Sequence, residues 1–242
     1  MLMPSLLSPL LSPLLSPLLA MLWSMVPSAS AAEPTPDRPS ISRSGFLAAA
    51  NTLEMEVGGR WQDGARSVPS TFKVSFGSVE PRLGFNLAGL DTEQLGLNAG
   101  AKFRFGDNPK AGIAGYVATA VPTHSGEAWW ATAQVLATGR FDSGRSLQGN
   151  GGLLVGAAND ELALIGVPLS VLLDQPVTRH TGVFGELGCV LDQGLQNWVI
   201  DLGAHWAPTN AMVADIGAGW DLGVEAPFVQ LGLTGNLGKF KR

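Results

Sequence analysis

The sequence predicts an all-β fold, a transmembrane antiparallel up-and-down β-barrel of about 12 strands (range 10-12) with short loops. Three observations predict it. Apolar residues alternate with polar residues or glycine in repeated short stretches that end at turn signals, tryptophans lie near the ends of these stretches, and the chain contains 31 glycines. Glycines in a barrel wall ease its curvature and leave space in the lumen, whereas in a soluble core they would leave side-chain positions empty.

The clearest alternation runs from Leu95 to Phe105. One face carries only apolar residues, Leu95, Leu97, Ala99, Ala101, Phe103 and Phe105. The other face is polar or small, Gly96, Asn98, Gly100, Lys102 and Arg104. A period of two with charge on the second face is typical of an outer-membrane strand, because one face meets lipid and the other meets water.

The same pattern predicts strands over 52-61, 71-79, 81-90, 95-105, 111-121, 129-141, 146-157, 162-173, 179-191, 198-206, 211-222 and 227-239. Turn signals separate them, among them Asp63-Gly64, Glu80-Pro81, Asp142-Ser143-Gly144 and Pro208-Thr209-Asn210. The range 162-173 is apolar on both faces, and without it and a neighbour ten strands would remain. An even number places both ends of the barrel on the periplasmic side.

Tryptophans indicate where the membrane interfaces lie. Trp198 and Trp206 share an apolar face, and their separation of eight residues is roughly 26 Å along a strand. After a tilt of about 40°, this is roughly 20 Å of depth, close to the spacing of the aromatic girdles of an outer-membrane barrel. We expect the membrane-interface aromatics to be Trp61, Trp129, Trp198, Trp206 and Trp220. The alternative, a soluble β-sandwich, would more often bury its tryptophans in the middle of strands.

The chain divides into three predicted segments. Residues 1-31 are leucine-rich, carry no charge and end in the A-x-A site Ala29-Ser30-Ala31, which predicts a signal peptide cleaved near Ala31. An uncleaved membrane anchor is the alternative. The proline-rich residues 32-50 are expected to be a flexible periplasmic lead-in, and residues 51-242 the transmembrane barrel.

Composition narrows the function classes. The net charge of -5 excludes a basic nucleic-acid surface, so we expect no nucleic acid partner. His180, His205 and Cys189 do not have the spacing of metal ligands. We therefore expect no metal, no cofactor and no catalytic residues.

Charged residues on the inward phase are the lumen-facing candidates. They are Glu54, Glu56, Arg60, Lys73, Arg82, Lys102, Arg104, Glu186, Asp201, His205, Asp215 and Asp221. Basic residues gather on the second to fourth strands and acidic ones on the first and the ninth to eleventh, so the two sets should face each other across the lumen. Two interpretations stay open: ion pairs that stiffen the interior, or a transverse field that selects polar or zwitterionic solutes.

The order of several short motifs resembles one family, the outer-membrane barrels called putative MetA-pathway of phenol degradation proteins. The similar segments are 52-56, Pro81-Arg82-Leu83-Gly84-Phe85, 97-105, Val121-Pro122-Thr123 with Gly126, Phe184-Gly185-Glu186, 214-219 and 231-240. In this chain Lys241 and Arg242 follow Phe240, whereas substrates of the barrel assembly machinery usually end on the aromatic residue. The resemblance implies an outer-membrane transporter of small molecules, among them hydrophobic or aromatic ones.

The sequence therefore predicts a porin-like protein of the cell outer membrane of a Gram-negative-type bacterium, for passive passage or binding of small molecules. Its expected partners are outer-membrane lipids, the barrel assembly machinery and a small-molecule solute. Two alternatives are a non-conducting structural or adhesive barrel, and an outer-membrane lipid hydrolase built around His124 and Ser125.

Overall fold

A computed structural model describes residues 34–37, 42–88, 94–121, 129–158, 161–192 and 196–240. These residues form twelve strands, which confirms the larger of the two predicted strand numbers. The strands are β1 Thr52–Gln62, β2 Ala65–Ser75, β3 Val79–Ala88, β4 Gln94–Asn108, β5 Ala111–Val121, β6 Trp129–Arg140, β7 Ser146–Ala158, β8 Glu161–Pro176, β9 Thr181–Leu191, β10 Gln196–Thr209, β11 Met212–Asp221 and β12 Ala226–Lys239.

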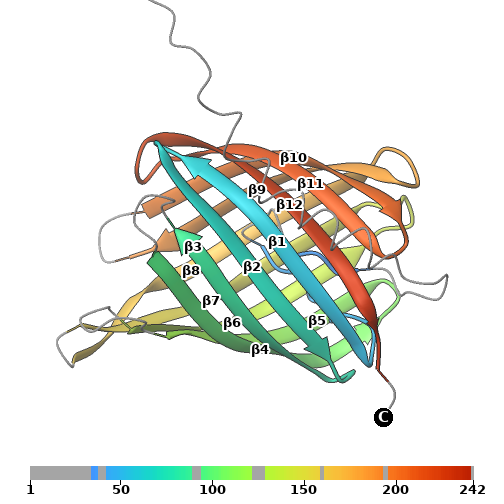
Figure 1. Cartoon of the computed structure of the whole chain (residues 1–242), viewed down its shortest axis with the longest axis horizontal. Helices are drawn as coiled ribbons and strands as arrows, with labels where there is room; N and C mark the ends of the chain where they lie inside the picture. The colour runs from blue at the N-terminus through green and yellow to red at the C-terminus, as the bar shows by residue number, and fades with distance from the viewer. Residues whose placement is uncertain are drawn as a thin grey trace, which may run out of the picture.

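Each strand pairs antiparallel with its neighbours in the chain, and β1 pairs with β12 to close the barrel. The closing pair runs from Thr52↔Lys239 to Gln62↔Phe228. Figure 1 shows the strands wound obliquely around the barrel axis. Closure satisfies the backbone groups of the wall, because a closed barrel has no edge strand.

The predicted alternation of faces is confirmed in the wall. In β3, the outward side chains of Leu83 and Leu87 are 55% and 48% exposed. Arg82, which precedes Leu83 and points to the opposite face, is buried. In β4, Phe103 is exposed and its neighbour Lys102 is fully buried. The outer surface is therefore apolar and the inner surface carries the charge.

The two ends of the barrel differ in what they contain. We call the end with Thr52 and Lys239 the terminal end and the opposite one the far end. Exposed aromatic side chains lie near both. Trp220 lies near the far end, where the half-buried Trp129 begins β6, and Trp206 lies near the terminal end with the exposed residues Phe76, Phe105 and Phe141.

Most predicted strand boundaries agree with the structure to within three residues, but β2 was placed wrongly. It runs from Ala65 to Ser75 instead of over 71-79, and it contains Pro69. The residues opposite Pro69 in β1 drop out of the pairing register, which continues at Arg60↔Ser67. A proline lacks the N–H group that a ladder needs, so the strand tolerates it only at this irregularity.

Glu80-Pro81 is likewise not a turn. Both residues belong to β3, and Pro81 pairs with Ala101 of β4. The turn before β3 is made by residues 76–78, where Gly77 has a φ of 94°.

The predicted signal peptide, 1-31, lies outside the described residues. In the part of the chain that the structure describes, no helix is long and apolar enough to cross a membrane.

Candidate functional site

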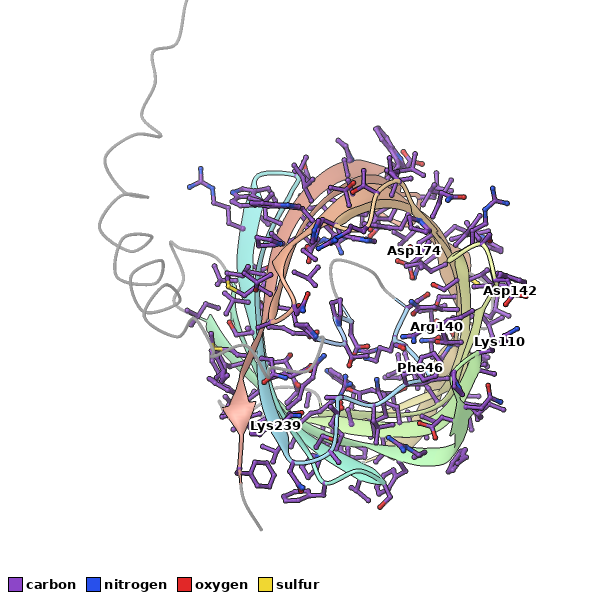
Figure 2. All side chains as sticks on the ribbon, turned by 90° about the vertical axis from the view of Figure 1, so that its right-hand side faces the viewer. Phe46, Lys110, Arg140, Asp142, Asp174 and Lys239 are labelled. Carbon is purple, nitrogen blue, oxygen red and sulfur yellow. The ribbon has the colours of Figure 1, made fainter. Side chains whose placement is uncertain are left out.

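The segment before β1 lies inside the barrel, so the prediction of a flexible periplasmic lead-in over 32-50 needs correction. We call residues 34–37 and 42–49 the N-terminal segment. It makes hydrogen bonds, ion pairs or ring contacts with β1, β2, β3, β4, β5, β6, β8 and β9. A chain can reach so many strands of a closed barrel only from the lumen. Figure 2 shows this segment within the ring of strands, with Phe46 beside Arg140.

Asp37 is the charged anchor of the N-terminal segment. Its carboxylate pairs with the Arg82 guanidinium and lies 3.5 Å from Lys102 Nζ and 3.8 Å from Lys73 Nζ. Burial alone would raise the pKa of Asp37, but Arg82, Lys102 and Lys73 together hold it well below the usual value of an aspartate. Asp37 is therefore an anion at neutral pH. Its backbone N–H also donates to Glu56 Oε1 at 2.7 Å.

Lys73 joins this anchor to the wall. Its Nζ lies 2.6 Å from Glu56 Oε1 and 3.8 Å from Glu54 Oε2, and it donates to the carbonyl oxygen of Thr35 at 2.7 Å. Lys73, Glu54 and Glu56 are buried. Buried ions are tolerated where each has partners of opposite charge and further hydrogen bonds, as here.

The second contact is made through the backbone of the N-terminal segment. Lys102 Nζ donates to the carbonyl oxygens of Ser44 and Phe46 at 2.9 and 3.2 Å. Gly45 N–H donates to Thr138 Oγ1 at 2.7 Å. A Cβ at Gly45 would lie 2.3 Å from the carbonyl oxygen of Gly112, so only glycine lets the segment approach β5 this closely.

An apolar patch on the inner wall receives the next residue of the segment. Leu47 is buried in a cluster with Ala114, Tyr116, Ala118 and Leu136. The inner face of a barrel is expected to be polar. We call this patch the apolar seat of Leu47, because the leucine side chain packs against it. Burying a leucine there contributes about 1.5–3 kcal/mol.

Ala48 completes the attachment. Its N–H donates to Glu80 Oε2 at 2.7 Å, and its carbonyl oxygen accepts from Ser75 Oγ at 2.8 Å. Glu80 also accepts from Arg82 Nε at 2.8 Å. Glu80 thus links the apolar seat to the charged anchor.

On the acidic side of the lumen, the carboxylates of Glu186 and Asp201 accept hydrogen bonds from uncharged groups. Ser42 N–H donates to Glu186 Oε1, and Ser42 Oγ bonds Ser170 Oγ at 2.9 Å. Asp201 accepts from Gln230 Nε2. Asp215, the third predicted acid of this side, is buried as well.

Four predicted lumen residues lie outside these clusters. Arg104 pairs with Asp107 at 3.2 Å. His205 Nδ1 lies 3.3 Å from Asp174 Oδ2. Arg60 and Asp221 share Gln62, which accepts from Arg60 Nη2 at 2.9 Å and donates to Asp221 at 3.2 Å.

The ion pairs that Lys73, Arg82 and Lys102 make among the described residues lie on their own side of the lumen or reach the N-terminal segment. Lys73, Arg82 and Lys102 are neutralised by Glu54, Glu56 and Glu80 of their own side and by Asp37 of the N-terminal segment. The segment stands between the two sets and binds to both.

Between this layer and the far end is a cavity of about 440 Å³. The N-terminal segment contributes Asp37 and Arg43 to it, and Arg82 and Tyr116 line it from the wall. Its other polar or aromatic lining residues are Glu56, Arg60, Ser67, Thr71, Asn86, Asn98, Trp130 and Gln230. The cavity has the size of a small-molecule pocket.

Sequence reasoning missed two groups of these residues. Asp37, Arg43 and Leu47 were assigned to a free lead-in because prolines precede them, although Asp37 and Arg43 are charged and Leu47 is apolar. Glu80 was assigned to a turn, although it stands two positions before Arg82 on the same face. The inward phase of Glu80 was the signal that could have found it.

The predicted hydrolase residues His124 and Ser125 lie outside the described residues. Within the described ranges, no group of three or more histidine, cysteine, aspartate or glutamate side chains could hold a metal ion.

Comparison with solved structures identifies similar barrels. The KdgM porin in complex with disordered oligogalacturonate has a TM-score of 0.63 and 9% identity, and the match covers 75% of this chain and 98% of that chain. The NanC porin has a TM-score of 0.61 and 7% identity, with 78% and 100% covered. The COG4313 outer membrane channel from Pseudomonas putida F1 has a TM-score of 0.61 and 11% identity, with 84% and 100% covered.

At these identities the likeness shows the fold, which is the fold of outer-membrane porins and channels. No protein-family model matches the chain, and no curated protein matches it. The resemblance to the phenol-degradation family thus stays a prediction.

Proposed function

We propose that this protein is an outer-membrane channel that admits or binds small solutes in the cell outer membrane of a Gram-negative-type bacterium. The observation that carries the proposal is that the wall has charged side chains inside and apolar side chains outside, the reverse of a soluble protein. Charged side chains such as Lys102 and Glu54 are fully buried inside, while large apolar ones such as Leu83 and Leu202 are 55% and 64% exposed outside. In water such a surface would be unfavourable, whereas in a bilayer it faces lipid.

The aromatic side chains support the same placement. Trp220 and Trp206 are 44% and 55% exposed near opposite ends of the barrel. Tryptophan is favoured at the two membrane interfaces because its ring is apolar and its N–H is polar. The chain ends then point to the periplasm, as is usual for barrels with an even number of strands.

In this arrangement the N-terminal segment narrows the passage from the periplasmic side. It is attached by Asp37, by backbone hydrogen bonds and by Leu47, and the cavity opens on its other side. We infer that the attached segment limits flow and that its detachment increases flow.

Conductance across planar bilayers tests this function. Refolded protein beginning at residue 32 should give small or rare openings, and the Leu47→Asp variant should give several-fold larger conductance, because a carboxylate is costly in the apolar patch. The matched control is Ala50→Asp, since Ala50 is exposed between the segment and β1. This control should behave as the unmodified protein.

Absence of conductance in all three proteins, with intact barrels by heat-modifiability on gels, would contradict the channel. It would favour the non-conducting structural or adhesive barrel instead.

A further inference from the structure

We propose that the 440 Å³ cavity binds an uncharged sugar ring, held by polar side chains of β2, β3 and β4 and by Trp130 of β6. This inference rests on the proposed function and deepens it, since it names a class of solute for the same lumen. Three observations carry it: a cluster of uncharged polar side chains, an indole ring in the same cavity, and charged lining groups that already have partners.

The polar cluster surrounds Gly84 on the inner face of the wall. Gly84 pairs with Thr71 of β2 and with Asn98 of β4. The amide of Asn98 lies over Gly84, where a Cβ would collide with it. Asn86 is two residues further along β3 and diagonal to Asn98, a separation of about 7–8 Å between such neighbours. One ring-shaped ligand therefore reaches both amides, and Asn86, Asn98 and Thr71 all line the cavity.

The cluster has hydrogen-bonding groups that suit a sugar. Asn86 Oδ1 is buried and accepts no hydrogen bond within the described ranges. A buried acceptor without a donor is unfavourable, so this oxygen favours a ligand that carries a donor. Each asparagine amide offers an acceptor and two N–H donors, and the hydroxyl of Thr71 can do either. Sugar hydroxyls also donate and accept, so they match this mixture.

Trp130 supplies an aromatic face to the same cavity, and its side chain is 37% exposed. Asn98 pairs with Ala120 of β5. The register of β5 with β6 places Ala120 beside Trp130. Trp130 is thus two strands away from Asn98, roughly 10 Å between backbones, and only the small side chain of Ala120 lies between them. The face of an indole ring is apolar and carries negative charge density, so the C–H face of a sugar ring packs against it.

The charged side chains of the lining have opposite charges nearby. The matched sets are Arg82 with Asp37, Glu56 with Lys73, Arg60 with Asp221 and Asp201, and Arg43 with Asp37. A charged solute would have to compete with these partners and would lose its own hydration as well. A neutral solute does not have this cost. The cavity volume is near the small end of the range for ligand pockets, which agrees with a single hexose ring and a few waters.

Isothermal titration calorimetry on the chain beginning at residue 32 tests the proposal. The detergent is lauryldimethylamine oxide, because it has no sugar head group. The neutral probes are D-glucose, D-galactose and D-mannose. D-glucuronate adds a carboxylate to the glucose ring, and cyclohexanol keeps a six-membered ring with a single hydroxyl. At least one hexose should bind, and at least about tenfold more tightly than cyclohexanol, because cyclohexanol cannot make several hydrogen bonds. Glucuronate should bind no more tightly than glucose.

Two variants remove the groups that the proposal uses. Trp130→Ala should weaken binding of that hexose about tenfold, and Trp130→Phe should keep part of the affinity because it keeps an aromatic face. Asn98→Ala should also weaken binding about tenfold. The matched control is Trp129→Ala, since Trp129 precedes Trp130 in β6 and points to the opposite face. This control should leave binding unaltered, and heat-modifiability on gels shows that each variant is folded.

Absence of hexose binding, or cyclohexanol binding as tight as that of the best hexose, would overturn the proposal. Tighter binding of glucuronate than of glucose, full hexose binding by folded Trp130→Ala, or equal losses in the two tryptophan variants would overturn it as well. Sugar binding without conductance would reject the channel and keep the sugar site, whereas conductance without sugar binding would do the reverse.

Discussion

At the scale of single residues, the lumen shows how a wall built of strands tolerates buried charge. Lys73 and Lys102 are fully buried, and each lies within 4.0 Å of a carboxylate and donates to a backbone carbonyl. The side chain that serves both is Asp37, which comes from the N-terminal segment instead of from the wall. Removing Asp37 should thus leave two buried cations with fewer partners.

Asp37 gives the segment a definite pH dependence. Because its pKa is lower in the attached state than in a released chain, ionised Asp37 favours attachment above the usual aspartate pKa of about 3.9. That contribution is lost as the pH falls through the lowered pKa. The Ser44→Cys variant, in a Cys189→Ser background, reports attachment through the reaction rate of its thiol with dithiodipyridine. Relative to the rate of a free thiol, this rate should stay low and constant from pH 7 to about pH 5. It should rise only in stronger acid.

Asp37→Asn in the same background should react at least about tenfold faster at pH 7, since breaking a buried ion pair costs about 3–5 kcal/mol. A rate equal to that of the parent would mean that Asp37 does not hold the segment.

In β4, neighbouring residues point to opposite faces of the wall, so the same substitution at Leu97 and at Asn98 should affect stability differently. Leu97→Arg places a charge on the lipid side and should destabilise the barrel by about 2–4 kcal/mol if the residue lies near the bilayer midplane. Asn98→Arg points to the cavity and should be tolerated far better. Unfolding in urea from lipid vesicles measures both, and equal losses would mean that the faces are exchanged.

At the scale of elements, the strands could be predicted from sequence because alternation is local. The order of residues from Leu95 to Phe105 is enough to predict which side chains face lipid, without knowing which strands lie beside it. The predicted range 71-79 missed the first half of β2, which runs through Pro69, where the pairing with β1 skips the facing residues. Local patterns cannot show which ladder positions of a barrel can lose a hydrogen bond.

The N-terminal segment could not be predicted in the same way. Its attachment depends on partners far away in sequence, such as Ser42 with Glu186 and Gly45 with Thr138. The apolar seat of Leu47 also combines residues from β5 and β6 that a polar-lumen rule would not expect. Several of the predicted inward charges are buried ions, and Lys73, Arg82 and Lys102 among them pair with Asp37 of the segment, which no local pattern indicates.

Gly112 of β5 tests the fit of the segment as an element. A Cβ at Gly112 would lie 2.7 Å from Phe46 Cδ1 and 3.1 Å from the carbonyl carbon of Gly45. Gly112→Val should leave the strand intact, because valine favours strands, and push the segment away. Trypsin should then cleave after Arg43 faster than in the parent protein. Gly139→Val is the control, since a Cβ there meets nothing within 4 Å, and equal cleavage of the two variants would contradict the fit.

At the scale of the whole molecule, the closed barrel fixes the position of every turn. Turns alternate between the terminal end and the far end, so orientation in the membrane follows from a single labelled site at each end. The terminal end also holds the attachment of the N-terminal segment. If it faces the periplasm, the cavity lined by Arg60 and Trp130 lies on the outer side of the N-terminal segment, and an external solute reaches the cavity before it passes the segment.

Cysteine labelling of intact cells tests this orientation. Val224 is 63% exposed in the turn between β11 and β12 at the far end, and Thr178 is exposed in the turn between β8 and β9 at the terminal end. In a Cys189→Ser background, a membrane-impermeant maleimide should label Val224→Cys in intact cells, because the far end faces outward. Thr178→Cys should be labelled only after the outer membrane is permeabilised. The reverse pattern would place the N-terminal segment on the outer side and the cavity on the periplasmic side, and labelling of neither site in intact cells would contradict a surface-exposed barrel.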